Sequence, residues 1–177
     1  DWIEPANVKI EGVGDARHAV IAKTGEPVEI GSIEKMSKSK RNTVDPDDII
    51  AAYGADTARW FMLSDSPPDR DVIWTEEGVQ GSWRFVQRLW RLFGQYDVKA
   101  AGEDKALDRK RDQTVHAIAQ DIEALGFNKA VARIYELTGA IEKAAPSASR
   151  TAAISALLLL VSPMMPHLAE EAWAAAN

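Results

Sequence analysis

The chain has 177 residues, a net charge of −6 and no cysteine. This size fits one or two domains with a buried core, and the absence of cysteine excludes disulfides and thiolate zinc sites. No apolar run reaches the ~18 residues that cross a bilayer, so we expect no membrane partner. The absence of cysteine is compatible with a cytoplasmic location, which we expect for this chain.

Three short segments near the start have the composition of β-strands. They cover residues 7–11, 16–23 and 27–33, and turn-forming stretches separate them: Gly12-Val13-Gly14-Asp15 and Thr24-Gly25-Glu26. We therefore expect two or three strands that lead into a lysine-rich loop.

Two short helices are expected after this loop. Asp45 is a suitable N-cap, Pro46 fits the first helical position, and Gly54 ends the helix. A second helix covers residues 55–64 and stops before Pro67-Pro68. Three carboxylates in these helices favour helix stabilisation over acid–base chemistry: Asp47, Asp48 and Asp56.

From Glu76 onward, helical periodicity dominates the sequence. The first long helix carries apolar residues at i, i+4, i+7, i+11 and i+14: Val79, Trp83, Val86, Trp90 and Phe93. Phe85, Leu89 and Leu92 widen this apolar face. We expect nearly all Trp, Leu and Met side chains to pack in the core. Because residues 157–161 are apolar on all sides, their helix should be central.

Further helices follow a polar connection at residues 95–103. One is centred on Ile118 and the next covers residues 127–141, before Pro146. Ser147 is expected to cap a fourth, and residues 167–176 open the last one after Pro163 and Pro166. The predicted fold is mostly α, with short β segments and a loop followed by an antiparallel helix bundle.

The lysine-rich loop is the stretch with the clearest chemical character. It reads Lys35-Met36-Ser37-Lys38-Ser39 and continues with Lys40, Arg41 and Asn42. Ammonium groups, hydroxyls and backbone N–H groups in an exposed loop can surround phosphate oxygens. A solvated charge run is the alternative interpretation.

Residues 35–39 match KMSKS, the second motif of class I aminoacyl-tRNA synthetases, and the following sequence resembles the leucyl family. The similarity continues through four separated landmarks, in the family's order: Gly54-Ala55-Asp56-Thr57-Ala58-Arg59, residues 66–74, residues 127–133 and residues 162–171. Isoleucyl and valyl enzymes usually have SLGN after KMSK, where this chain has SKRN.

The resemblance implies a division into two parts. Residues 1–74 would be the end of the catalytic domain, and residues 75–177 a truncated helical bundle of the anticodon-binding type. The implied reaction activates leucine with ATP and Mg²⁺ and transfers it to tRNA(Leu). No obligate protein partner is evident.

The motif also implies which residues meet ATP. Lys38 and Lys35 match the family's two lysines and would stabilise negative charge in the transition state. Lys38 is the first choice for the ATP contact. Met36 and Ser37 would approach ATP through backbone groups, and Ser39 would shape the loop.

Three arginines on the first long helix are candidates for tRNA binding. Arg84, Arg88 and Arg91 follow i, i+4, i+7 spacing and share one face, which suits either the tRNA backbone or water. Arg109-Lys110-Arg111 is a weaker patch. His167 with Glu170 and Glu171 has metal-ligand spacing, but a helix N-terminus explains these residues better.

Two alternatives to a leucyl enzyme stay open. An isoleucyl or valyl enzyme shares the motif, although Thr57 and Pro67-Pro68 favour the leucyl pattern. A stand-alone helical RNA-binding module would have no use for the lysine loop. The chain begins with Asp1, ends in a helical pattern at Asn177 and lacks a HIGH-type motif, so we expect a piece of a longer enzyme that is inactive alone.

Overall fold

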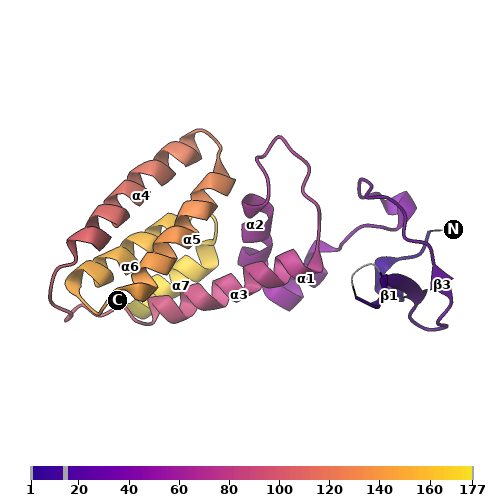
Figure 1. Cartoon of the computed structure of the whole chain (residues 1–177), viewed down its shortest axis with the longest axis horizontal. Helices are drawn as coiled ribbons and strands as arrows, with labels where there is room; N and C mark the ends of the chain where they lie inside the picture. Colours follow the sequence, from indigo (N-terminus) through magenta and orange to yellow (C-terminus); the bar gives the residue numbers. More distant parts are fainter. Residues whose placement is uncertain (1, 14–15, 177) are drawn as a thin grey trace. The chain divides into compact units, whose positions relative to one another are not determined.

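The computed structural model describes residues 2–13 and 16–176. The chain divides into two compact units, Asp1–Asp48 and Ile49–Asn177. The described residues form a small sheet in the first unit and a helical assembly in the second (Figure 1), so the mostly α fold is confirmed. The expected domain division between residues 74 and 75 stays a prediction.

The first unit contains a three-stranded antiparallel sheet in the order β1-β2-β3. Its strands are β1 (Val8–Glu11), β2 (His18–Ile21) and β3 (Pro27–Val28), and a 3₁₀ turn, η1 (Pro5–Asn7), precedes them. The expected extension of the third strand to residue 33 was wrong. Its continuation packs against no core, since Ile30 and Ile33 are 61% and 79% exposed. Gly14 and Asp15 of the first predicted turn lie outside the described residues.

The two short helices are confirmed. In α1 (Pro46–Tyr53), the backbone N–H of Asp47 donates to Asp45 Oδ1 at 3.0 Å, which is the predicted cap. Gly54 then has φ = 83°, a conformation that favours glycine, and joins α1 to α2 (Ala55–Ser64).

Five longer helices complete the second unit (Figure 1): α3 (Glu76–Phe93), α4 (Lys105–Glu123), α5 (Phe127–Lys143), α6 (Ala148–Val161) and α7 (Pro166–Ala176). Ser147 caps α6 as predicted, since its Oγ accepts from the N–H of Arg150 at 3.1 Å. Asp104 similarly caps α4, a start that the sequence analysis did not predict. No described helix is long and apolar enough to cross a membrane.

Residues of α2 to α7 form the core, which includes an aromatic cluster. Trp60 of α2 stacks on Phe85 of α3 with ring centroids 5.1 Å apart, and its indole N–H donates to the hydroxyl of Tyr135 at 3.1 Å. Burial raises the pKa of the Tyr135 hydroxyl. This cluster joins α2, α3 and α5.

The expectations about the core were confirmed in part. On α3, Val79 and Phe93 of the predicted stripe are buried together with Phe85, Leu89 and Leu92. Trp90 is 46% exposed, so the expectation that nearly all Trp side chains pack in the core was wrong. Helix α6 contacts α3, α4, α5 and α7, as expected of a central helix, although Leu159 is 57% exposed. Helix α3 therefore has a second apolar stripe beside the one that faces the core.

Candidate functional site

The lysine loop, residues 35–42, lies in the first unit as an exposed segment with a defined backbone. It is extended at Ser37, where φ is −150°, and then forms a 3₁₀ turn, η3 (Lys38–Lys40). Arg41 ends the turn in the left-handed conformation with φ = 53°. The loop thus presents its side chains from a tight turn.

The lysines of this loop have different surroundings. The ammonium group of Lys40 pairs with Glu34 and lies 5.4 Å from the centre of the Trp2 ring. Lys35 and Lys38 are exposed, and within the part of the chain that the structure describes neither forms an ion pair. The two lysines that match the motif are therefore the ones available to an anion.

The polar groups between these lysines are bonded to one another. The backbone N–H of Ser37 donates to Asn42 Oδ1 at 2.7 Å, and the hydroxyls of Ser37 and Ser39 are 2.8 Å apart. The Asn42 amide also donates to the carbonyl of Lys35 at 3.4 Å. In this arrangement the Ser37 N–H is already used, and Met36 is exposed.

The three candidate arginines of α3 also differ in their contacts. Arg84 and Arg91 are exposed. Arg88 binds the Glu142 carboxylate through two nitrogens at 2.8 and 2.5 Å and lies 5.9 Å from the Phe85 ring. The hydrogen bond from Arg88 lowers the pKa of Glu142, and the same bond raises the pKa of Arg88.

The weaker basic patch on α4 is largely engaged in ion pairs. Lys110 pairs with Glu136 at 2.7 Å, and Arg111 binds both Asp108 and Asp112 at 2.8 Å. Arg109 is exposed. The patch therefore offers less free positive charge than its sequence suggests.

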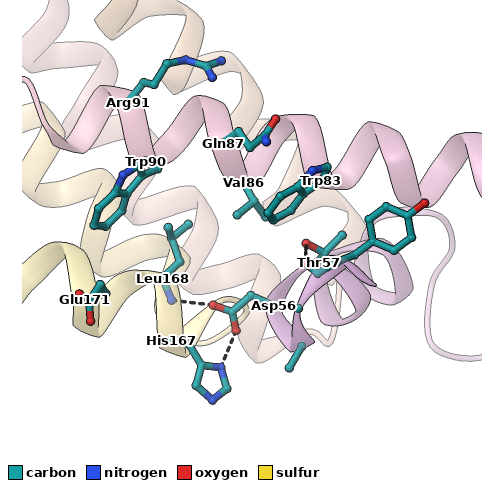
Figure 2. Close-up of a pocket in the computed structure, with 13 residues that line it drawn as sticks. Asp56, Thr57, Trp83, Val86, Gln87, Trp90, Arg91, His167, Leu168 and Glu171 are labelled. Carbon is teal, nitrogen blue, oxygen red and sulfur yellow. Dashed lines mark hydrogen bonds and ion pairs between the residues drawn. The ribbon is translucent and has the colours of Figure 1, made fainter. Parts of the chain in front are cut away.

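The sequence predicted that Asp56 stabilises its own helix, but not that it caps a different one. Asp56 is buried and accepts from the N–H of Leu168 at 2.6 Å, at the start of α7 (Figure 2). Its other oxygen is 2.9 Å from Nδ1 of His167. His167 thus stands at a helix N-terminus. No group of three metal-ligating side chains occurs among the described residues.

Arg59, one turn further along α2, contacts the same connection between α6 and α7. Its Nε donates to the carbonyl of Met164 at 3.0 Å, and Nη2 donates to the carbonyl of Pro163 at 2.9 Å. Asp56 and Arg59 therefore fix the α6–α7 turn from one side. The Gly54–Arg59 motif was visible in the sequence, but its partners lie over 100 residues away.

A groove of about 670 Å³ opens between α2, α3 and α7 (Figure 2). The second apolar stripe of α3, formed by Trp83, Val86 and Trp90, lines it together with Leu168. Arg91, one of the exposed arginines, also lines this groove.

Two family descriptions match separate parts of the chain. Residues 28–75 match class I tRNA synthetases for isoleucine, leucine, methionine and valine, and residues 104–177 match the anticodon-binding domain of tRNA ligases. The first match contains the lysine loop and the second contains most of the helical bundle. A stand-alone RNA-binding module does not account for the first match.

Two relatives and one solved structure that are similar to the chain are all leucine enzymes of this kind. Leucine–tRNA ligases from Novosphingobium aromaticivorans and Rhizorhabdus wittichii are 70% and 60% identical over 98% of the chain, which covers 20% of each relative. The ternary complex of Agrobacterium radiobacter K84 agnB2 LeuRS, tRNA and LeuAMS has a TM-score of 0.71 at 26% identity. That similarity covers 81% of this chain and 21% of the solved one.

The lysine loop, the helical bundle and these matches agree on one class: in both of its parts the chain is similar to the class I tRNA synthetases. Within that class, the relatives named above are leucine–tRNA ligases, and the chain spans about one-fifth of their length.

Proposed function

We propose that this chain is the part of a leucine–tRNA ligase that holds the ATP phosphates and contributes a tRNA-binding helical domain. The observation that carries the proposal is the state of the KMSKS loop, in which Lys35 and Lys38 are exposed and unpaired among the described residues. The proposed enzyme acts in the cytoplasm on leucine, ATP and tRNA(Leu).

The proposed role of the two lysines depends on where negative charge develops during the reaction. The leucine carboxylate attacks the α-phosphate of ATP, and negative charge grows on the departing pyrophosphate. Two ammonium groups on an exposed loop can approach that pyrophosphate and stabilise the transition state more than the ground state.

Mg²⁺ enters this proposal as part of the ATP complex. The loop offers cations and hydroxyls, and no described residues form a cluster of three metal ligands. Mg²⁺ commonly binds through substrate phosphates and water with few protein ligands. The role of this chain is thus to bind and orient the phosphates, and Met36, Ser37 and Ser39 shape the surface that meets ATP.

The test is Lys38→Ala in the full-length ligase, measured by ATP–pyrophosphate exchange with leucine. We expect kcat to fall by roughly 10²-fold with a much smaller change in KM for ATP. Lys38→Arg should restore only part of the rate, because a planar guanidinium does not reproduce a compact ammonium. Lys23→Ala, an exposed lysine in the same unit, is the matched control. A raised KM with unchanged kcat would refute a role in the transition state.

We also propose that Arg84, Arg88 and Arg91 contact the sugar–phosphate backbone of tRNA. Their common face on α3 supports this, together with the exposure of Arg84 and Arg91. Because Arg88 is bound to Glu142, its contribution should be smaller than that of its two neighbours.

A further inference from the structure

Asn42 lies three residues beyond the KMSKS motif and joins two points within it. Its Oδ1 accepts from the N–H of Ser37 at 2.7 Å, and its Nδ2 donates to the carbonyl of Lys35 at 3.4 Å. The first distance is that of a strong hydrogen bond, and the second is at the weak end of the range. One side chain therefore restrains the backbone on both sides of Met36.

We propose that Asn42 is a positioning residue that holds Lys35 and Lys38 in the arrangement required by the phosphates of ATP. This inference rests on the proposed function of the lysine loop. Asn42 itself need not touch ATP, because its amide is occupied by the loop backbone. It would act by fixing where the two lysine side chains leave the main chain.

The other contacts of the loop support this assignment. Glu34 and Lys40, which flank the motif, form an ion pair, and Lys40 also lies over the Trp2 ring. The η3 turn then closes with the N–H of Arg41 donating to the carbonyl of Lys38 at 3.2 Å. These bonds restrain the backbone and one lysine, and they leave the two motif lysines unpaired among the described residues.

Restraint of this kind matters because the loop is exposed and has no core of its own. Lys35, Met36 and Lys38 are all exposed, so packing does not determine their backbone conformation. Catalysis by electrostatic stabilisation requires charges that are already in place when the transition state forms. A loop without the Asn42 bonds would have to be ordered during each turnover.

The experiment measures leucyl-adenylate formation in the full-length ligase in single turnover. Asn42→Ala is expected to lower the maximal rate about tenfold, by analogy with the cost of small misplacements in an active site, with a much smaller change in the ATP concentration at half-maximal rate. Thr43→Ala is the matched control. The neighbouring Thr43 is exposed, and its side chain makes no hydrogen bond within the described residues.

A combined variant separates positioning from a general structural effect. If Asn42 acts through the two lysines, adding Asn42→Ala to Lys35→Ala/Lys38→Ala should slow the reaction no further. If the rate losses of the lysine and Asn42 substitutions multiply, the proposal is wrong. It is also wrong if Asn42→Ala has the wild-type rate while Lys38→Ala is slow, and in that case the proposed function of the loop is unaffected. An unchanged rate for Lys38→Ala would instead remove the proposed function and this inference together.

Trypsin cleavage in the absence of ATP provides a readout that does not depend on activity. Loss of the Asn42 bonds should speed cleavage after Lys35 and Lys38 relative to Thr43→Ala, at an unchanged melting temperature. If Asn42→Ala also unfolds the protein, Asn42→Asp keeps the acceptor for Ser37, and Thr43→Asp controls for its charge. A rate for Asn42→Asp well above that of Asn42→Ala supports the proposal, and an equal or lower rate counts against it.

Discussion

At the scale of single residues, the second unit depends on polar side chains that complete the ends of helices other than their own. Asp56 supplies an acceptor to the first turn of α7, and Arg150 supplies a donor to a carbonyl of α5. Arg150 is only 8% exposed, and its Nε donates to the carbonyl of Ile141 at 3.0 Å. Both satisfy backbone groups that a helix end leaves without partners.

Replacement of Asp56 tests the importance of such an interaction. Asp56→Ala leaves the N–H of Leu168 without its acceptor, and we expect a loss of about 1–3 kcal/mol in the free energy of unfolding. Asp56→Asn should lose less, because an amide oxygen can still accept. Asp69→Ala, an exposed aspartate in a loop, is the control. Denaturant unfolding of the 177-residue chain measures all three, and equal stability of Asp56→Ala and Asp69→Ala would contradict the assignment.

The ion pair between Arg88 and Glu142 predicts a dependence of stability on pH. Since the hydrogen bond from Arg88 lowers the pKa of Glu142 in the folded state, the pair stabilises the fold above the usual glutamate pKa of about 4.3. This contribution is lost as the pH falls through the lowered value. Because both side chains are partly exposed, we expect the pair to contribute at most about 1 kcal/mol to the free energy of unfolding at neutral pH.

Glu142→Gln provides the measurement. The difference in unfolding free energy between the wild type and Glu142→Gln should be largest near pH 7 and should shrink as the pH falls below the usual glutamate pKa of about 4.3 and through the lowered pKa of Glu142. Glu170→Gln, the control, removes one exposed charge that has no ion pair among the described residues. A difference that stays constant across this pH range would show that the pair contributes no pH-dependent stability.

At the scale of elements, the packing of α2 against α3 depends on the absence of a side chain at one helical position. A Cβ atom added to Gly78 would lie 2.6 Å from Cε2 of Phe61 and 2.7 Å from Oγ1 of Thr75. Phe61 is buried, and Thr75 is the N-cap of α3, bonded to the N–H of Gly78. Neither neighbour can move without disturbing the junction of the two helices.

Gly78→Ala should therefore destabilise the second unit by about 1–3 kcal/mol, although alanine is the better helix former. Gly81 in the same helix is the matched control, because its nearest neighbour is the flexible end of Arg84 at 3.8 Å. Gly81→Ala should stabilise by roughly 0.5–1 kcal/mol. Thermal unfolding distinguishes them, and the expectation is wrong if both variants shift the melting temperature in the same direction.

The limits of sequence reasoning are also visible at this scale. Helix ends fixed by local chemistry, such as the caps at Asp45 and Ser147, could be predicted. The orientation of α3 could not, because its core stripe and its groove stripe are both apolar and periodicity does not distinguish them. The hydrogen bond between Asp56 and Leu168 joins residues 112 positions apart, beyond the reach of any local pattern.

The same distinction applies to the candidate site. KMSKS identified the lysines, but the sequence does not show that Lys40 is paired while Lys35 and Lys38 are not, within the part of the chain that the structure describes. On α3, the spacing placed the three arginines on one face, yet Glu142 comes from α5 and binds Arg88. Which cations remain available depends on tertiary contacts.

At the scale of the whole molecule, the distribution of charge matters more than its sum. The chain has a net charge of −6, which does not favour RNA at long range. The tRNA binding that we propose would then depend on local groups of exposed cations. Arg84 and Arg91 form such a group on α3, whereas two of the three basic residues at 109–111 are held in ion pairs.

The salt dependence of tRNA binding tests this local origin. In the full-length ligase, Arg84→Ala/Arg91→Ala should weaken tRNA(Leu) binding and reduce the slope of log K against log salt by about 0.7–0.9 for each phosphate that is no longer neutralised. Arg88→Ala should change the slope less, because Glu142 already engages its guanidinium. Arg109→Ala, an exposed arginine on α4, is the control. Leucyl-adenylate formation should be unaffected in all variants, since it precedes the tRNA step.

If the double variant keeps the wild-type affinity and slope with its fold intact, these arginines face water, and tRNA is bound elsewhere.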